Sequence, residues 1–307
     1  MRFPSAVDLP AGLTTRPLTL ADAGAVAGVI AAQEVFDLGE AMIEEADIVG
    51  DWQRPSFDTS ARTIGIFEGP RLVAYAEVSG NGRGDAAVDP DFRGRGLGTA
   101  LAAWTQETAR RHGDTTIGMP VLEGSAGEKL LRSLGYEPRW TSWVLALPEG
   151  SDVQAQPLPD GYSVRAAEPS EHTAAWTVAE DAFLEWSVRD RQPFDDWSSS
   201  VVDRPGFEPW MLRVAVDPHQ QVVGISHVVI AEGCAYVAKL AVRADQRRRG
   251  LARALLADSF AVAREHGSHR SELSTDSRTG ALDLYLKLGM QVTSTWVNLG
   301  SRCPDVS

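Results

Sequence analysis

Two stretches of this sequence place glycine and arginine at the start of an apolar helix pattern, DFRGRGLGTAL and DQRRRGLARAL. The first N–H groups of a helix have no partner within the helix, and glycine lets a ligand come close to the backbone. Arginine side chains nearby can add charge-assisted bonds to phosphate oxygens. Both stretches therefore predict an anion site. Its candidate residues are Arg93, Gly94, Arg95, Gly96, Leu97 and Gly98 in the first stretch and Arg247, Arg248, Arg249, Gly250, Leu251 and Ala252 in the second.

Other phosphate-binding motifs fit these residues less well. A dinucleotide fingerprint needs G-x-G-x-x-G, whereas the first stretch has Gly94, Gly96 and Gly98, and the second lacks the first glycine. A Walker loop needs G-K-S/T, which neither stretch contains. A solvated helix start with exposed arginines is the alternative for one stretch alone. Two such stretches in the same context make that alternative weaker.

The two stretches belong to an internal repeat with a spacing of 154 residues, the distance from Arg93 to Arg247. The same spacing relates Leu134-Gly135 to Leu288-Gly289. The segments before them, TTRPLTLAD and SVRAAEPSE, match more loosely. The chain is therefore predicted to contain two copies of one domain.

Each copy is expected to be one α/β domain, the first covering residues 1–150 and the second residues 160–307. The segment 147–161 between them is rich in proline, glycine and short polar residues, as linkers are. Periodic patterns predict strands and helices in each domain, including a hairpin over 210–231 in the second. In the second copy we expect strands at 162–167, 210–217, 222–231, 234–242, 271–274 and 291–299 and helices within 171–202, 250–265 and 279–289, and the first copy repeats this order.

The composition argues against several classes of protein. A net charge of −13 argues against general nucleic-acid binding, which depends on basic patches. No apolar run approaches the roughly 20 residues of a membrane helix, and the N-terminus lacks the apolar core of a secretory signal. Two cysteines cannot form a disulfide framework or a four-ligand zinc site, so no metal is expected. We therefore expect a cytoplasmic protein that acts on a small molecule, with its oligomeric state open.

The pattern R-x-x-G-x-G/A followed by an apolar helix resembles the GCN5-related N-acetyltransferases, or GNAT proteins, and both stretches satisfy it. A second family motif, LYxxLGF, is matched by LYLKLGM at 284–290, with Met290 in place of phenylalanine. LLRSLGY at 130–136 matches less closely. The resemblance covers most of each half, and it implies for each domain a mixed, mostly antiparallel sheet flanked by helices. The tandem arrangement resembles double-domain acetyltransferases of the mycothiol-synthase type.

This resemblance implies acetyl-CoA as the cofactor, with its pyrophosphate on the loop amides. The pantetheine arm would lie like an added strand beside 236–242 or 85–89. The neighbours that this arrangement adds to the cofactor site are Val88, Leu240, Ala241 and Val242. An amine would attack the thioester carbonyl without a covalent enzyme intermediate. This reaction needs a proton acceptor for the ammonium, amides near 240–242 for the oxyanion, and an acid for the thiolate.

Tyr285 lies where the resemblance implies a tyrosine near the sulfur of the coenzyme. A phenol with an ordinary pKa of about 10 can donate a proton to a thiolate whose pKa is about 8.5. A core tyrosine on an amphipathic helix is the alternative. The equivalent residue of the first copy is Leu131, which cannot donate a proton. The second copy is therefore the expected catalytic domain, and the first is expected to bind coenzyme A without turnover or to act as a scaffold.

The proton acceptor is less clearly defined by the sequence. His227 on the third strand of the second copy has a suitable ordinary pKa, and Glu272 or Asp276 could accept a proton through water. Glu77 is the counterpart in the first copy. Each of these residues could instead be structural. The acidic side chains within 34–51, and those within 180–196 that are mixed with tryptophans, predict a lip that attracts a cationic amine, or else a solvated helix face.

These observations together predict an N-acetyltransferase that moves acetyl from acetyl-CoA to a small, cationic amine. A narrower hypothesis, from the resemblance, is an amino-sugar cysteine conjugate as the acceptor. Acetylation of a protein is a further possibility. An alternative of another class is a non-catalytic acyl-CoA-binding or sensing protein. Tyr285 favours the enzyme, whereas Leu131 and the lack of an obvious base favour the sensor.

Overall fold

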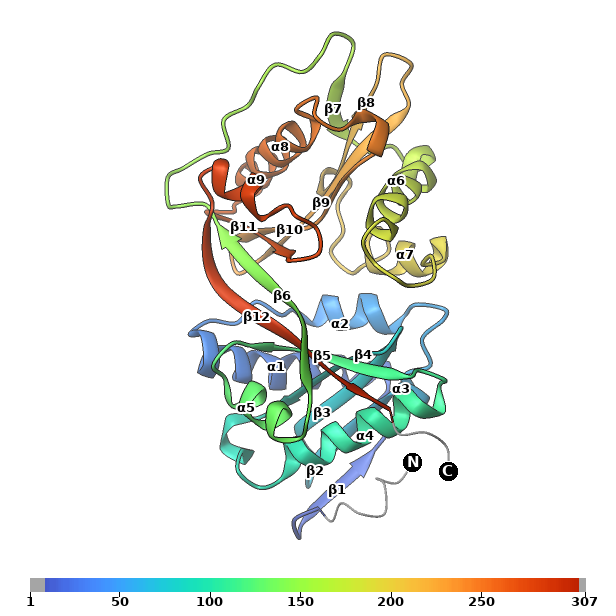
Figure 1. The fold of residues 1–307 in the computed structure, drawn as a ribbon, viewed down its shortest axis with the longest axis vertical. Helices are drawn as coiled ribbons and strands as arrows, with labels where there is room; N and C mark the ends of the chain where they lie inside the picture. Colours follow the sequence, from blue (N-terminus) through green and yellow to red (C-terminus); the bar gives the residue numbers. More distant parts are fainter. Residues whose placement is uncertain (1–8, 304–307) are drawn as a thin grey trace. The chain divides into compact units, whose positions relative to one another are not determined.

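A computed structural model describes residues 9–303 of the chain (Figure 1). Contacts divide the chain into two compact units. Unit 1 comprises the described residues up to Ser142 together with those from Thr295 onward, and unit 2 comprises Trp143–Ser294. The units do not coincide with the contiguous halves 1–150 and 160–307 expected from the sequence, because the end of the chain belongs to unit 1.

Unit 1 is a mixed, mostly antiparallel sheet with helices on both faces (Figure 1). Strands β1 to β4 pair antiparallel in chain order, β4 and β5 run parallel, and the end of β12 pairs antiparallel with β5. Its elements are β1 (Leu13–Arg16), α1 (Ala23–Leu38), α2 (Glu45–Trp52), α3 (Thr59–Arg62), β2 (Thr63–Glu68), β3 (Arg71–Gly80), β4 (Arg83–Val88), α4 (Leu97–Arg111), β5 (Thr116–Leu122), α5 (Ala126–Ser133), the start of β6 (Glu137–Ala146) and the end of β12 (Gln291–Arg302).

The helices of unit 1 cover the two faces of its sheet with separate apolar clusters. On one face, Val26 of α1 and Trp52 of α2 pack against Tyr75 of β3. On the other, Leu101 and Trp104 of α4 pack against the sheet. Burial of apolar surface is the main term that stabilises such layers. The two layers hold β4 and the start of α4 in place.

Unit 2 repeats this arrangement. Strands β7 to β10 pair antiparallel in chain order, and β10 and β11 run parallel. Trp197 of α7 and Val178 of α6 pack on one face, and Phe260 of α8 packs on the other. Its elements are the end of β6, β7 (Ser163–Ala166), α6 (His172–Leu184), α7 (Phe194–Ser200), β8 (Leu212–Val216), β9 (Val222–Ala231), β10 (Cys234–Val242), α8 (Leu251–Glu265), β11 (Arg270–Asp276), α9 (Leu282–Lys287) and the start of β12.

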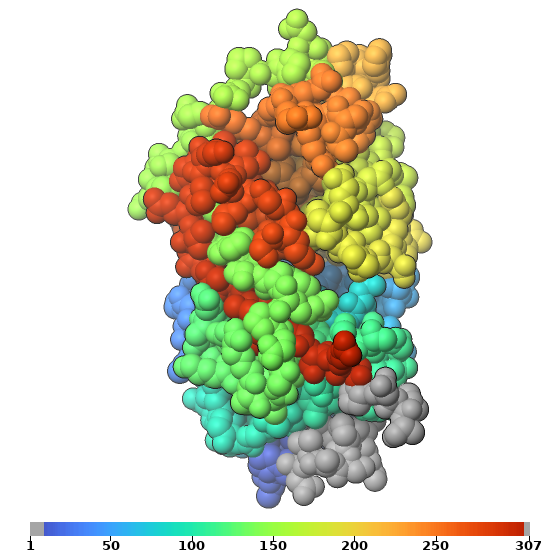
Figure 2. Space-filling model, in the orientation of Figure 1, coloured from blue at the N-terminus to red at the C-terminus, as the bar shows by residue number. Residues whose placement is uncertain are grey.

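The fold class expected from the sequence is confirmed, and the placement of the last strands differs from it. The segment 291–299 was expected to end the second copy, but β12 continues into unit 1, where Trp296–Arg302 pair with Leu122–Thr116 of β5. Figure 2 shows the dark red end of β12 among green and cyan side chains of unit 1. In return, Leu145 at the end of β6 is buried in the core of unit 2. Each unit thus receives a strand end from the other copy of the repeat.

Most other elements match their expected ranges within a few residues. The region 171–202, expected to be helical, contains two helices, α6 and α7, with non-helical residues between them. Within residues 9–303, none of the helices combines the length and the apolar character that crossing a bilayer requires.

Candidate functional site

The glycine loop of unit 1 ends in an open helix N-terminus. Gly94 and Gly96 have φ values of 75° and 83°, in the left-handed region that glycine adopts without strain. Helix α4 begins directly afterwards at Leu97, and no side chain of the described residues caps it. Its first N–H groups are therefore available to a ligand, and the helix dipole favours an anion there.

The loop of unit 2 has the same backbone conformation. Arg248 has φ 62° at the position of Gly94, and Gly250 has φ 82° before α8 begins at Leu251. As in unit 1, no described side chain caps the helix. The chain thus holds a non-glycine residue in the left-handed region at Arg248, which costs about 1–2 kcal/mol. This conservation of shape between the copies supports a common role for the two loops.

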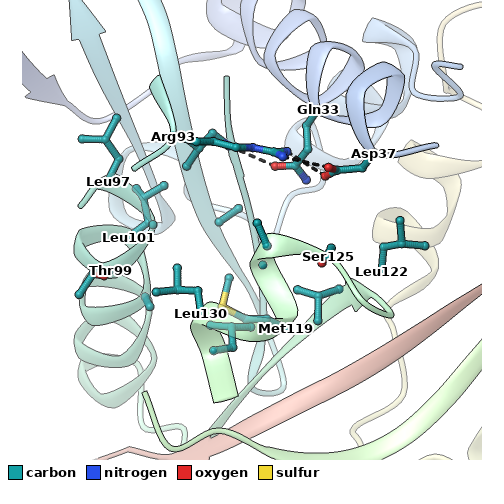
Figure 3. Close-up of a pocket in the computed structure, with 18 of the residues that line it drawn as sticks. Gln33, Asp37, Arg93, Leu97, Thr99, Leu101, Met119, Leu122, Ser125 and Leu130 are labelled. Carbon is teal, nitrogen blue, oxygen red and sulfur yellow. Dashed lines mark hydrogen bonds and ion pairs between the residues drawn. The ribbon is translucent and has the colours of Figure 1, made fainter. Parts of the chain in front are cut away.

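A cavity of about 380 Å³ lies beside the loop of unit 1, where β4 and β5 diverge (Figure 3). The two strands are paired at Arg83 and Gly118 only. Beyond this point both strands line the cavity, β4 through Ala86 and Val88. The remaining wall is mostly apolar and includes Leu97, Leu101, Met119, Val121, Leu130 and Leu131. The space between the strands therefore leads from the loop to a largely apolar interior.

The edge of β4 that faces this cavity carries backbone groups that bond to no neighbouring strand. Asp89 donates its N–H to Val73 of β3, so alternate residues of β4 bond toward β3 and the residues between them point the other way. Ala86 and Val88 consequently present their N–H and C=O groups toward β5, which has moved away. An extended ligand with amide groups fits such an edge as an added strand would.

The first arginine of each loop is committed to a carboxylate. Arg93 makes a bidentate pair with Asp37 near the end of α1, with N–O distances of 2.9 and 2.8 Å (Figure 3). Arg247 makes the same kind of pair with Glu185, just after α6, at 2.7 Å for both bonds. These two guanidinium groups therefore hold the loop against the preceding helix, a role that the sequence did not suggest. Arg95 lies over the ring of Phe92 instead.

In unit 2 the strands β10 and β11 also diverge. They pair over Cys234–Val237 and Arg270–Leu273, and β10 has a bulge between Val237 and Lys239. The candidate residues Leu240, Ala241 and Val242 follow this bulge. Leu240 and Val242 face Leu251 and Leu255 of α8, while Ala241 packs on the α6 face. The C=O of Val242 accepts a bond from Nε of Arg247 at 3.1 Å.

Tyr285 of α9 is 7% exposed and packs with Leu256 and Phe260 of α8. Burial raises the pKa of Tyr285 to about 12, so its phenol stays protonated at neutral pH. Leu131, the equivalent residue of unit 1, is 4% exposed and lines the cavity. Unit 2 therefore has a proton donor at this position and unit 1 has none.

His227 and Glu272 lie on the opposite face of the unit 2 sheet from Tyr285. Ser226 bonds to Ser259 of α8, so the next residue of β9, His227, faces α6. Glu272 likewise faces away from α8, because the next residue, Leu273, packs in the α8 cluster. The structure thus places His227 and Glu272 on the two strands that flank β10, and it does not bring them into contact with Tyr285.

The buried imidazole of His227 is a poor base. The side chain is 3% exposed, and burial, followed by the nearby positive charge of Lys239, lowers the pKa of His227 to about 3. Neither ring nitrogen has a hydrogen-bond partner among the described residues. At neutral pH the imidazole is neutral and takes up a proton only at considerable cost.

Two of the acidic residues within 34–51 are used inside unit 1. Asp37 pairs with Arg93, and Glu34 accepts bonds from the backbone N–H groups of Met42 and Ile43 at 2.8 and 3.1 Å. Burial raises the pKa of Glu34 above its ordinary value. These two carboxylates therefore organise the end of α1, and the acidic lip expected from the sequence loses two of its members.

Sequence reasoning missed Gln33, which lines the cavity four residues before Asp37. Its Oε1 accepts a hydrogen bond from the N–H of Val88 at 3.2 Å (Figure 3). Residues four apart share one face of a helix, so the pattern Gln33-x-x-x-Asp37 was visible in the sequence. The missing information was that this face meets β4 and the loop.

Comparisons with known proteins agree with this geometry. The family model described as "Acetyltransferase (GNAT) family" matches residues 20–136 and 172–290. The mycothiol acetyltransferase of Salinispora tropica is 30% identical over 271 residues, which cover 81% of this chain and 82% of that protein. The mycothiol acetyltransferase of Thermobispora bispora is 28% identical over 250 residues, 75% of this chain and 80% of that protein.

Solved structures share the architecture of the whole chain. A GCN5-related N-acetyltransferase from Sphaerobacter thermophilus has a TM-score of 0.74 at 28% identity, covering 98% of this chain and 99% of that chain. A tandem GNAT protein from the clavulanic acid biosynthesis pathway has a TM-score of 0.73 at 18% identity, covering 96% and 100%. The second likeness concerns the fold alone.

Proposed function

Because the chain belongs to the GNAT family of acetyltransferases, it transfers an acetyl group from acetyl-CoA, and we propose that its acceptor is the amine of a small molecule. The observation that carries the placement of the donor is the uncapped start of α4, which opens onto the cavity between β4 and β5. Helix N–H groups suit a diphosphate, the edge of β4 suits amides, and apolar walls suit methylene groups. The loop of unit 2 offers the same anion site.

We place the chemical step in unit 2. Bound acetyl-CoA supplies an acyl group activated as a thioester. Amides at 240–242, beside the divergence of β10 and β11, would stabilise the oxyanion that forms when the amine nitrogen attacks. As the C–S bond breaks, Tyr285 would donate its proton to the thiolate, a role for which its high pKa keeps it protonated.

The proton of the attacking ammonium needs a separate acceptor. Glu272 is our candidate, directly or through a water molecule, because it lies on β11 beside the divergence and is 8% exposed. His227 is a weaker candidate, since its pKa of about 3 leaves little affinity for a proton. Its neutral ring would instead fill space beside β10 without adding a second positive charge near Lys239.

Unit 1 is proposed to bind acetyl-CoA without transferring its acetyl group. Its loop and cavity are well formed, but Leu131 occupies the position of the proton donor. The non-catalytic alternative considered for the whole chain is thereby restricted to this unit. The full protein is an enzyme, as its relatives are.

We further propose that the acceptor is an amino-sugar cysteine conjugate of the mycothiol type. This proposal is supported by mycothiol acetyltransferases with about 30% identity over most of both chains. A cytoplasmic location completes the proposal, because two cysteines, Cys234 and Cys303, provide no disulfide framework of the kind that secreted proteins often carry.

The test measures thiol release from acetyl-CoA with a panel of small amines. Tyr285→Phe should lower kcat by about 10²- to 10⁴-fold with little change in the KM for acetyl-CoA. Tyr136→Phe is the matched control, a buried tyrosine that does not line the cavity. If Tyr285→Phe keeps kcat within about threefold of the parent, the assigned proton donor is incorrect.

Two loop variants identify the unit that carries out the reaction. In Gly96→Asp and Gly250→Asp the new carboxylate caps the helix itself and repels phosphate, and aspartate tolerates the left-handed backbone better than most residues. Gly250→Asp should lower turnover more than about 100-fold, and Gly96→Asp should lower it less than about tenfold. The reverse order would place the chemistry in unit 1.

A further inference from the structure

The amide edge of β4 in unit 1 has an occupant that belongs to the chain itself. Val88 points its N–H into the gap left by β5, where a ligand amide would bond. Gln33 reaches this N–H from α1 and accepts the bond through its side-chain carbonyl at 3.2 Å. The primary amide of glutamine has the same acceptor chemistry as the amide carbonyl of a pantetheine arm.

Three further facts place Gln33 in the path of a ligand. Its side chain is half-buried and lines the cavity of about 380 Å³. It lies beside the Arg93–Asp37 pair, which fixes the loop at the same end of the cavity (Figure 3). Val88 also ends the strand that leads into the loop and the uncapped start of α4. An acyl-CoA whose diphosphate sits on α4 must therefore pass Gln33 to reach the apolar interior.

We propose that Gln33 is a displaceable occupant of the thioester-binding groove of unit 1, and that it lowers the affinity of this unit for acyl-CoA. This inference rests on the proposed binding of acetyl-CoA in unit 1. Binding exchanges one acceptor on the Val88 N–H for another, so the ligand gains little from this bond. The displaced carboxamide must find another partner, such as water.

Unit 2 lacks this device. Helix α1 begins at Ala23 and α6 at His172, 149 residues later, and this spacing places Ala182 at the position of Gln33. Counted back from the loop-fixing carboxylate Glu185, the counterpart is Asp181, whose carboxylate pairs with Arg191 instead. Alanine has no acceptor to offer the edge of β10. The two units have otherwise similar loops, and we infer that they differ in affinity for acyl-CoA. Unit 1 binds it more weakly, because the ligand must first displace Gln33 from the Val88 N–H.

The experiment measures acetyl-CoA binding to one unit at a time, by titration calorimetry on the full chain. The Gly250→Asp background leaves unit 1 to be measured. In this background Gln33→Ala should lower the Kd by about two- to tenfold, the range that the net value of one hydrogen bond allows. Gln33→Glu should raise the Kd more than about tenfold, because a carboxylate holds the N–H more strongly and repels the diphosphate.

Opposite signs for these two variants distinguish displacement from a merely structural role. If Gln33→Ala weakens binding or changes the Kd by less than about 1.5-fold, the proposal is overturned. The matched control is Gln33→Ala in the Gly96→Asp background, which leaves unit 2 to be measured. A change of similar size there would also overturn it, since the effect would not arise in unit 1.

The same titrations separate this proposal from the one on which it rests. If the Gly250→Asp chain binds no acetyl-CoA while its thermal unfolding is intact, unit 1 is not a donor site, and both proposals fail. If that chain binds acetyl-CoA but Gln33→Ala has no effect, only the role of Gln33 fails.

Discussion

Glu77 shows how burial changes the chemistry of a single side chain. Its carboxyl group is 6% exposed on β3 and accepts a hydrogen bond from Nε1 of Trp52 at 2.7 Å. Burial, followed by the charge of Asp85 on β4, raises the pKa of Glu77 to about 7. The group is thus balanced between its two forms near neutral pH, unlike an ordinary glutamate.

We expect Glu77 to make unit 1 less stable as the pH rises. Its folded pKa of about 7 lies above the ordinary 4.5, so its full contribution is present below pH 4.5 and is lost as the pH rises to about 7 and beyond. The loss amounts to roughly 3 kcal/mol of unfolding free energy. Glu77→Gln keeps an acceptor for Trp52 and should flatten this dependence. Urea titrations of the full chain at several pH values would show this dependence.

The control for this measurement is Glu123→Gln, which alters an exposed carboxyl group of the same unit. This substitution should leave the dependence of the unfolding free energy on pH as it is in the parent protein. If stability falls with pH equally steeply in the parent protein and in Glu77→Gln, the pKa of this carboxyl group is not raised.

The strand–loop–helix element is repeated with its shape intact and its residues changed. Gly94 and Arg248 both have positive φ, yet only glycine adopts this conformation without strain. The interaction that fixes each loop is a bidentate pair between arginine and a carboxylate near the end of the preceding helix. The neighbouring Arg247–Glu185 pair therefore holds the loop in its shape, and Arg248 keeps its positive φ despite the strain.

Relief of this strain gives a prediction for unit 2. Arg248→Gly should raise its unfolding free energy by about 0.5–1 kcal/mol, the left-handed penalty less the chain entropy of glycine. Arg249→Gly is the matched control, because Arg249 lies outside the left-handed region and glycine there should only destabilise. Denaturant titrations of both variants test the sign. Equal effects of the two substitutions would contradict the assignment of strain to Arg248.

At this scale the sequence predicted a good deal. Glycine positions, apolar spacing and the repeat predicted both loops and the helices behind them within a few residues. The pairing of Gln33 with Val88 could not be predicted, since it joins residues far apart in the chain. Likewise, Arg93 and Arg247 were expected to face phosphate, whereas each pairs with a carboxylate in the structure. A sequence does not show which carboxylate the fold brings within reach of an arginine.

In the whole molecule, the strand ends are exchanged between the two copies. Leu299 of β12 is fully buried in unit 1, and Leu145 of β6 is fully buried in unit 2. The sequence predicted both strands but not their partners. Alternation of apolar residues shows which face of a strand is buried, and it does not show which neighbouring strand the backbone will bond.

The exchange predicts crossed effects of core mutations. Leu299→Ala should destabilise unit 1 by about 2–5 kcal/mol, although this residue lies near the C-terminus, and Leu145→Ala should do the same to unit 2. Amide hydrogen exchange would report the difference, with faster exchange in β3 for the first variant and in β9 for the second. Faster exchange in β9 for Leu299→Ala and in β3 for Leu145→Ala would refute the exchange of strands.

The position of β12 also has a consequence for how the protein is made. A ribosome releases the chain from the N-terminus, so Trp296–Arg302 emerge long after β5, the strand with which they pair. Until they do, β5 keeps a bare edge, which is open to pairing with other nascent chains. The half of the repeat that is translated first is therefore the half that is completed last, and cutting the gene between its two copies would leave both products unfinished.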